Sequence, residues 1–566
     1  MAPEGETRPL LLGTTPPELD NQPTTPSPLR NSVAAPDDDV VQGRGSAFSR
    51  SLGTAEAFAI VISIVIGSGV FTSPGSIDTN VPSPGAALVV WLVGGVLAWT
   101  GASTMAELGT AIPGEGGVQP YLRYIFGDVF GFLAAWTWVV AVMPATLAIL
   151  SIVFVESIYS AAGVTGEAGR IAHKLLSVLV LVLVSIANSI STKTTTRLNG
   201  FFVLTKFAAV AAVVIAGLAV VIVQASHPDR DDVGGRDWFT KPWFGTRPTI
   251  NPDESRTDWE DLSEWELLGH YSTALYGALW AYSGWDKAIY ISAELSAPAK
   301  QLPLAINTAI PTIVLCFITA NAAYYVLLPW DVVSTTDSVA VTAVTRLLGR
   351  APGIAAAALI CLVVAGSLLG NSFVAGRMAV AAARQGWLPR ALARLGSLGG
   401  AKDQDQEDQD QNRRSQDRTA SEDSDGDDSS VDNNKEAAVE SDAPVNAIAL
   451  SAALATLYVL GGSFRALLTF NGLGEYAFFF LAVLGAVVLR VREPGLRRPY
   501  RPPIAVPVIF ALVSGFVVVR GALFAPALAA LLVVLWGVGG VVYWMRGRGG
   551  MMREEGEEGE EREEEG

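Results

Sequence analysis

Residues 60–75 read IVISIVIGSGVFTSPG, an apolar run that is interrupted by Gly67-Ser68-Gly69 and followed by Pro74. Inside a helix a glycine costs about 1 kcal/mol relative to alanine, and a proline removes a backbone donor and crowds the preceding turn. The run therefore predicts a helix that breaks near its middle. Lipid does not tolerate the free backbone groups of such a break, so the break must line a cavity inside the protein.

A second interruption lies in residues 275–286, which read LYGALWAYSGWD and turn small and polar at Ser283-Gly284. The two runs are the first and the sixth apolar segments of the chain. They occupy corresponding positions if the first ten segments form two halves of five. Paired interrupted spans in two halves are typical of the binding site of a secondary transporter.

The two breaks together offer complementary backbone groups. The N-terminus of a half-helix presents N–H donors and a positive dipole end to a carboxylate, and unwound carbonyl groups accept hydrogen bonds from an ammonium group. This combination fits the zwitterion of an α-amino acid. The alternative for Gly67-Ser68-Gly69 is close packing against another helix, for which small residues are also used.

The composition predicts an all-α integral membrane protein. Of 566 residues, 50% are hydrophobic and 17% charged, where a soluble protein has about 25% charged residues, and the mean hydropathy is +0.37. A membrane-spanning helix needs roughly 20 apolar residues. We count twelve candidate spans, at 55–79, 85–109, 128–158, 172–190, 199–223, 267–293, 306–329, 353–375, 445–461, 467–490, 504–520 and 523–545.

Charge divides the chain into segments and predicts its orientation. An even number of spans places both termini on one side, and lysine and arginine gather near the span ends on that side, which is therefore predicted to be cytoplasmic. The expected segments are a disordered N-terminal tail at 1–53, spans 1–8 at 54–395, an acidic disordered loop at 396–444, spans 9–12 at 445–545 and an acidic C-terminal tail at 546–566, whose Glu/Gly run is also expected to be disordered.

The extracytoplasmic loop at 226–266 combines acidic residues with aromatic ones. It contains Trp238, Phe239, Trp243, Phe244, Trp259 and Trp265. Two interpretations remain open: a folded cap on the outer face, or a mobile acidic loop whose tryptophans anchor it at the membrane interface.

Several classes of function are excluded by the residue inventory. Only two cysteines, Cys316 and Cys361, and three histidines are present, which excludes a disulfide scaffold and a cysteine zinc cluster. No phosphate-binding loop, metal spacing or pair of catalytic carboxylates is found. We therefore expect no cofactor, no metal and no enzymatic activity. The net charge of −16 argues against nucleic acid as a partner.

Charged residues inside the spans are few and informative. Lys206 lies in the fifth span, where a charge is costly and usually functional; it could stand in for a bound cation, or its amine could reach the cytoplasmic interface along its flexible stem. Glu107 and Glu294 are interpreted as partners of cytoplasmic bases. The role of Asp286, which follows the second break, is left open.

The chain resembles the L-type amino acid transporters of the amino acid–polyamine–organocation superfamily from about residue 52 to 545. The motifs that carry the resemblance occur in the family order. They are Gly67-Ser68-Gly69-Val70-Phe71, the run from Ala106 to Pro113 with Gly116-Gly117, the string from Ala278 to Asp286, Glu294, the run from Gln301 to Ile306, the stretch from Gly366-Ser367 to Pro389, and the stretch from Arg498 to Val508.

This resemblance implies a five-plus-five inverted repeat with broken helices 1 and 6, followed by two extra helices. It implies that Gly67, Ser68 and Gly69 bind the substrate carboxylate, and that carbonyls near Val65, Trp280 and Ser283 accept from the ammonium. Trp280 falls on the family's aromatic gate, and Lys206 on a lysine that replaces a sodium ion. The candidate substrate-binding residues are Val65, Gly67, Ser68, Gly69, Trp280, Ser283, Gly284 and Asp286.

The chain also departs from the family pattern. The loop at Tyr159–Arg170 has no cysteine, so no disulfide-linked heavy chain is expected. The acidic insertion and the long polar tails are what we would expect of a fungal permease, and the related fungal branch includes methionine permeases. Ser283 lacks the acid that some carriers of cationic substrates have at this position.

The sequence thus predicts a sodium-independent secondary transporter of neutral L-amino acids, methionine included, that works by alternating access in the plasma membrane. A carrier of cationic amino acids or polyamines, with Asp286 as the counter-charge, is one alternative. Another is a transporter-like amino acid sensor that signals through its polar cytoplasmic segments.

Overall fold

A computed structural model describes residues 54, 58, 61–62, 65–112, 117–164, 170–190, 192–227, 233–286, 298–393 and 444–564. The predicted N-terminal tail at 1–53, the acidic segment 396–443 and Glu294 lie outside these residues. Every contact below is between described residues.

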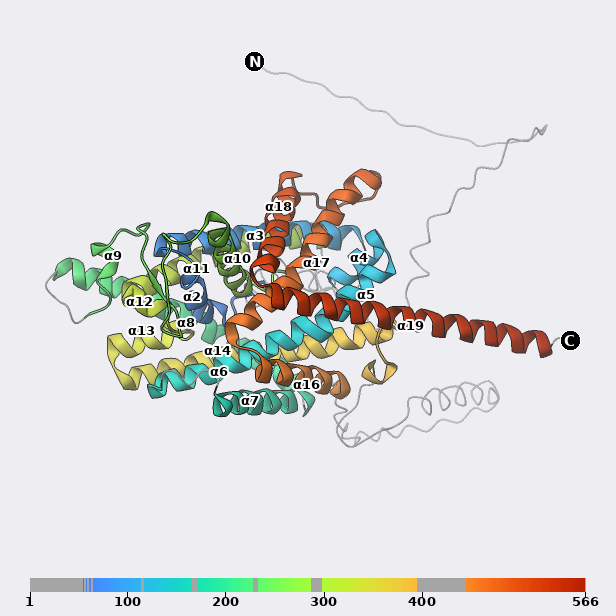
Figure 1. Cartoon of the computed structure of the whole chain (residues 1–566), viewed down its shortest axis with the longest axis horizontal. Helices are drawn as coiled ribbons and strands as arrows, with labels where there is room; N and C mark the ends of the chain where they lie inside the picture. Colours follow the sequence, from blue (N-terminus) through green and yellow to red (C-terminus); the bar gives the residue numbers. More distant parts are fainter. Residues whose placement is uncertain are drawn as a thin grey trace, which may run out of the picture. The chain divides into compact units, whose positions relative to one another are not determined.

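The described residues are almost entirely helical (Figure 1). The elements are α2 (Gly69–Asp78), α3 (Pro84–Ala111), α4 (Val118–Phe126), α5 (Asp128–Thr137), η1 (Trp138–Val142), α6 (Met143–Ala162), α7 (Ile171–Ile190), α8 (Thr192–Ser226), α9 (Asp237–Thr240), β1 (Thr249–Ile250), β2 (Arg256–Thr257), α10 (Glu264–Ala281), α11 (Pro298–Leu327), α12 (Trp330–Val333), α13 (Val339–Leu348), α14 (Arg350–Arg384), η3 (Arg390–Ala393), α16 (Val445–Gly461), α17 (Phe464–Arg492), α18 (Ala505–Phe524) and α19 (Pro526–Glu564).

Within this part of the chain, nine helices are long and apolar enough to cross a membrane. They are α3, the continuous α5–η1–α6 segment, α7, α8, α11, α14, α17, α18 and the first half of α19. The other three predicted spans correspond to the shorter helices α2, α10 and α16. The prediction of an all-α, multi-pass membrane protein is confirmed, and α2 and α10 are short because the predicted breaks end them.

Two helices differ from the sequence expectation. The third span is not a uniform α-helix: η1 is a π-helical turn, and Pro144 is the second residue of α6, the helix that follows it. Proline lacks the N–H that an α-helical turn requires, so the ladder widens at this point. The helix α19 continues to Glu564, beyond the predicted end of the last span at residue 545, and the expected disorder of the acidic tail stays a prediction. Glutamate and methionine are good helix formers.

The interior of the helical assembly is built around α6. In the most apolar 18-residue stretch of the span formed by α5, η1 and α6, 83% of the residues are buried. In the corresponding stretch of α19, 11% are buried. Among the helices that contact α6 are α7, α14, α16 and α17. In Figure 1, α6 and α14 lie side by side, and α19, in red, continues well beyond its neighbours. We infer that α6 is a core helix and that α19 presents most of its apolar surface to lipid.

Residues 233–263 form a folded segment, which we call the cap. It contains α9 and the antiparallel pair of β1 and β2. Trp259 is buried and donates its indole N–H to Thr249 Oγ1 at 2.8 Å. Trp238 donates to Gln224 Oε1 at 2.7 Å, and Trp243 donates to the carbonyl of Trp238 at 2.8 Å. Of the two interpretations of this loop, the structure therefore favours the folded cap.

A buried ion pair fastens α3 to α17. Arg490 donates to both carboxylate oxygens of Glu107, through Nε at 2.9 Å and through Nη2, and Nη2 also donates to the Pro502 carbonyl at 2.8 Å. Arg498 Nε lies 3.4 Å from Glu107 Oε1. The side chains of Glu107 and Arg490 are 1% and 5% exposed. This confirms the interpretation of Glu107 as a structural partner for a base.

Replacing Arg490 with methionine should destabilise the protein strongly. The change leaves the Glu107 carboxylate buried with only the longer contact to Arg498, and breaking a buried pair on one side costs about 3–5 kcal/mol. Thermal unfolding of the protein in detergent measures the effect. Arg492→Met is the control, since Arg492 is exposed and an exposed charge contributes less than about 1 kcal/mol. Equal shifts for both variants would contradict the assignment.

Candidate functional site

The two broken helices pack side by side in opposite directions. The helix α2 begins at Gly69, and α10 ends at Ala281. A Cβ atom built on Gly69 would lie 2.4 Å from the Ala281 Cα atom, so the two backbones touch. Farther along, the position of a Cβ on Gly277 lies 3.0 Å from Ile77. The pair is therefore antiparallel, with the N-terminus of α2 against the C-terminus of α10.

The start of α2 offers backbone donors. Phe71 N–H bonds to the Ser68 carbonyl at 3.0 Å in a tight turn. No backbone carbonyl of the described residues accepts from the N–H groups of Gly69 or Val70, as is general for the first turn of a helix. These donors lie at the positive end of the α2 dipole. They provide the environment that an anionic group prefers.

The end of α10 offers backbone acceptors at the same level. Tyr282 N–H bonds to the Ala278 carbonyl and Ser283 N–H to the Trp280 carbonyl, both at 3.0 Å, which closes the last turn. Gly284 follows with φ of 107°, a value that a residue with a side chain rarely adopts. The chain therefore leaves the helix axis here, just after Ala281, whose backbone adjoins the start of α2.

The two glycines of the first break have different surroundings. Gly69 is required by packing, because any side chain would collide with Ala281. Among the described residues, a Cβ on Gly67 would find nothing closer than the Ser367 hydroxyl and the Val65 carbonyl, both at 3.9 Å, an ordinary van der Waals contact. The packing alternative thus accounts for Gly69, whereas a methyl group on Gly67 would collide with none of these residues.

Ser367 is a candidate that sequence reasoning did not single out. It lies on α14, is 8% exposed, and faces the position of the Gly67 Cβ. Its hydroxyl finds no hydrogen-bond partner among the described residues, although buried polar groups are normally paired. Gly366-Ser367 begins one of the motifs of the family resemblance, which was the available signal.

The aromatic residues of the second break differ in how far their side chains are exposed. Tyr282 and Trp285 are 0% and 1% exposed. Trp285 is held by the rings of Phe479 and Phe510, with centroids 4.7 and 5.9 Å away. Trp280 and Ser283, in contrast, are partly exposed. Trp280 packs against the core as well, but it keeps part of its surface exposed.

The remaining predicted residues are buried. Val65 is 1%, Ser68 3% and Asp286 5% exposed. Ser68 precedes the first residue of α2, and Asp286 follows Trp285 in the turn after α10. The structure thus brings the residues of the two breaks into one region, with the backbone supplying most of the polar groups.

Lys206 points into the protein and not to the membrane surface. It is 7% exposed and shares the buried face of α8 with Ala209, Val210 and Val213, whereas Leu204 and Phe207 are 68% and 40% exposed. This burial argues against an amine that reaches the aqueous interface. The helix α8 packs against α14, which carries Ser367.

Comparison with known proteins identifies the family of the chain. The sequence pattern of the amino acid permease family matches residues 52–544. The chain belongs to the amino acid permease family. As a member, it is a multi-pass membrane transporter and not an enzyme.

Three relatives are similar to this permease over most of their length. It is 27% identical to the human b(0,+)-type amino acid transporter 1 over 88% of each chain. It is 26% identical to the rat large neutral amino acids transporter small subunit 2, over 92% of this permease and 85% of that protein. It is 25% identical to the human cystine/glutamate transporter, over 81% and 78% respectively.

The two glycines should respond differently to alanine. Gly69→Ala forces α2 away from α10, so we expect a loss of stability of about 1–3 kcal/mol, the usual cost of overpacking. Gly67→Ala should leave stability within about 0.5 kcal/mol, the range of changes that disturb no packing, yet reduce amino acid uptake because the methyl group occupies space at the break. Thermal unfolding and uptake are measured on both variants. Normal uptake by Gly67→Ala would remove this residue from the site.

Proposed function

We propose that this permease moves neutral L-amino acids across the membrane by alternating access. The observation that carries the proposal is the contact between the N-terminus of α2 and the C-terminus of α10. It places backbone donors and backbone acceptors side by side in the interior of the protein. An α-amino acid carries one anionic and one cationic group on adjacent carbon atoms and can satisfy both.

In the proposed complex the carboxylate accepts hydrogen bonds from N–H groups of Gly67, Ser68 and Gly69. The ammonium group donates to carbonyls of Val65, Trp280 and Ser283. The side chain of the substrate extends into the space beside Gly67, where Ser367 and Trp280 face it. Because recognition of the two charged groups uses backbone atoms, selectivity among amino acids depends on these side chains.

A neutral substrate is favoured by the residues of the second break. Ser283 carries no charge, so the acid of some carriers of cationic substrates is missing at this position. The relative named as a large neutral amino acids transporter supports this class. Methionine is our first candidate within it.

A carrier of cationic amino acids or polyamines is the second candidate, because Asp286 is buried at the same break. Its carboxylate could neutralise a second ammonium group. The proposal for neutral substrates requires instead that the charge of Asp286 is balanced within the protein. Competition between neutral and cationic compounds separates the two candidates.

We further propose that transport is sodium-independent, with Lys206 as a fixed cation in place of the ion. Its burial on the face of α8 that packs inward supports this role. We place the permease in the plasma membrane with both termini in the cytoplasm, in keeping with the distribution of lysine and arginine.

Uptake into proteoliposomes tests the proposed function. Labelled leucine and methionine should accumulate equally with and without sodium, and unlabelled neutral amino acids should compete, whereas lysine and spermidine should not. A proton gradient and internal amino acid are varied separately to distinguish symport from exchange. Competition by the cationic compounds alone would refute the neutral assignment in favour of the second candidate.

Lys206→Ala should lower the uptake rate at least tenfold, because no positive charge then occupies the position that we assign to a cation. A tenfold lower rate corresponds to a barrier that is higher by about 1.4 kcal/mol. Lys206→Arg, which keeps the charge, should retain more activity. Lys174→Ala is the control, since Lys174 is a partly exposed residue at the start of α7 whose amine bonds to the Leu460 carbonyl. Unchanged kinetics for Lys206→Ala at equal membrane levels would show that the charge has no role.

A further inference from the structure

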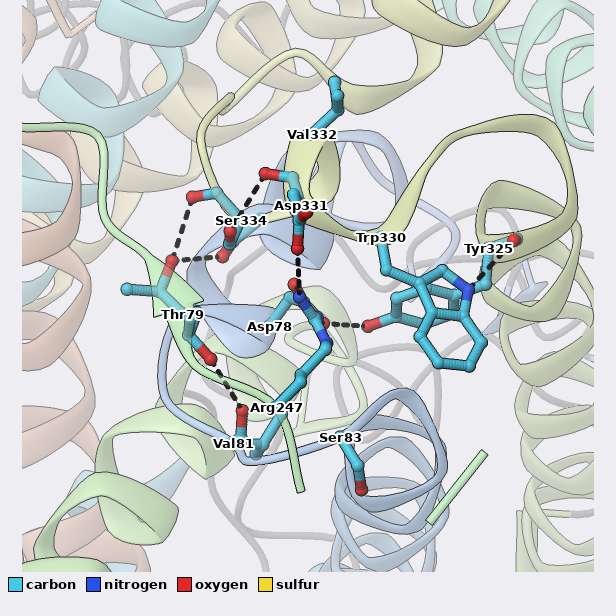
Figure 2. A network of polar contacts seen from close by, with 12 residues as sticks. Asp78, Thr79, Val81, Ser83, Arg247, Tyr325, Trp330, Asp331, Val332 and Ser334 are labelled. Atoms are coloured by element: carbon cyan, nitrogen blue, oxygen red, sulfur yellow. Dashed lines mark hydrogen bonds and ion pairs between the residues drawn. The ribbon is translucent and has the colours of Figure 1, made fainter. Parts of the chain in front are cut away.

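The far end of α2 carries a buried charge. Asp78 is the last residue of α2 and its side chain is 0% exposed. Arg247, from the cap, donates through Nη2 to both carboxylate oxygens at 2.7 and 2.8 Å. Tyr325, at the end of α11, donates its hydroxyl to Asp78 Oδ1 at 2.6 Å. Three segments that are distant in sequence therefore converge on one carboxylate (Figure 2).

The cap is fastened to α2 by further contacts of Arg247. Its guanidinium lies 3.5 Å from Asp331 Oδ1, and its backbone N–H bonds to the Pro82 carbonyl at 3.1 Å, just after α2 ends. We call Asp78, Arg247, Tyr325 and Asp331 the α2 lock. Figure 2 shows the Arg247 side chain reaching Asp78 between the segments that carry Tyr325 and Asp331.

A second group of contacts holds the residues after Asp78. Thr79 donates to the Ser334 carbonyl at 3.0 Å. Arg465, at the start of α17, donates to the Thr79 hydroxyl and to Asp337, the latter at 2.9 Å. Asn80 Oδ1 lies 3.0 Å from His270 Nδ1 of α10. The end of α2 is thus closed off by the cap, by the segment after α11 and by α17.

We propose that the α2 lock keeps the transport site closed on the cap face and that it must open in each transport cycle. This inference rests on the proposed function, since it assigns the lock to the same site. The helix α2 is 10 residues long, with the amino acid site at its N-terminus and the lock at its C-terminus. A substrate that approaches from the cap face cannot reach the breaks while Asp78 binds the cap.

The chemistry of the lock suits a reversible closure. When α2 and the cap separate, the ion pair of Asp78 and Arg247 breaks and water hydrates both charged groups. This hydration offsets much of the lost attraction. A well-packed apolar contact has no such compensation from water. The lock therefore adjusts the populations of two forms, and weakening it shifts the equilibrium toward the form that is open on the cap face.

The test is the accessibility of a cysteine placed at the break. Ser367→Cys is made in a chain in which Cys316 and Cys361 are replaced by alanine. A membrane-impermeant thiol reagent is added from the cap face, identified as the face from which the exposed position Glu260, changed to cysteine, is labelled. Labelling rates are then compared with the lock intact and weakened.

Arg247→Gln should speed labelling of the cysteine about tenfold, because it removes hydrogen bonds to a charged group. Tyr325→Phe removes one hydroxyl and should act in the same direction, about two- to threefold. It also carries the test if Arg247→Gln does not reach the membrane. Lys241→Gln is the matched control, since Lys241 pairs with Asp237 at 3.0 Å within the cap and is half exposed.

Equal labelling rates in Tyr325→Phe, Arg247→Gln and Lys241→Gln would overturn the proposal. The assay requires no substrate, so its result is separate from that of uptake. Uptake is measured in the chain that keeps Ser367, because the Ser367→Cys change is itself expected to impair substrate binding. Faster labelling, together with no uptake by the chain that keeps Ser367, would refute the proposed function and retain the lock as a closure of the cavity. Unchanged labelling rates, together with uptake of neutral amino acids by the chain that keeps Ser367, would overturn the lock and leave the proposed function in place.

Discussion

The structure depends on a backbone constraint: a helix that ends inside a membrane protein exposes polar groups that lipid cannot satisfy. Here two helices end at the same level, and the contact of Gly69 with Ala281 holds their ends together. The donors of α2 and the acceptors of α10 thereby share one region. The surrounding helices keep this region away from lipid, and α14 contributes Ser367 to it. The chemistry proposed for the site follows from this arrangement.

The helix α2 connects the proposed site with the cap face. Its N-terminus is positioned by Ala281 and its C-terminus by Arg247, so a movement of the cap that pulls on Asp78 is transmitted to the site along a short helix. The ion pair of Glu107 and Arg490 is different, because it joins α3 to α17 and contacts neither break. We regard it as part of the scaffold against which α2 and α10 move. The distinction separates charges that hold the fold from charges that control its two forms.

The sequence predicts features that depend on local patterns. The twelve apolar runs, the interruptions at Gly67-Ser68-Gly69 and at Ser283-Gly284, and the pairing of Glu107 with a base can all be inferred from residue types and spacing. The packing role of Gly69 cannot, because it depends on Ala281, more than 200 residues away. Arg247 and Asp78 are separated by 169 positions, and no periodicity links a loop arginine to the end of one helix. That the buried hydroxyl of Ser367 has no hydrogen-bond partner among the described residues likewise follows only from packing.

The central claim is that the meeting ends of α2 and α10 bind both charged groups of an amino acid. The most direct test is calorimetric binding of L-leucine and L-methionine to the purified permease, compared with their methyl esters and their N-acetyl derivatives. An ester lacks the carboxylate, and an N-acetyl derivative lacks the ammonium group. We expect the free amino acids to bind and either modification to weaken binding at least a hundredfold. Binding of an ester or an N-acetyl derivative as tight as that of the free amino acid would contradict it.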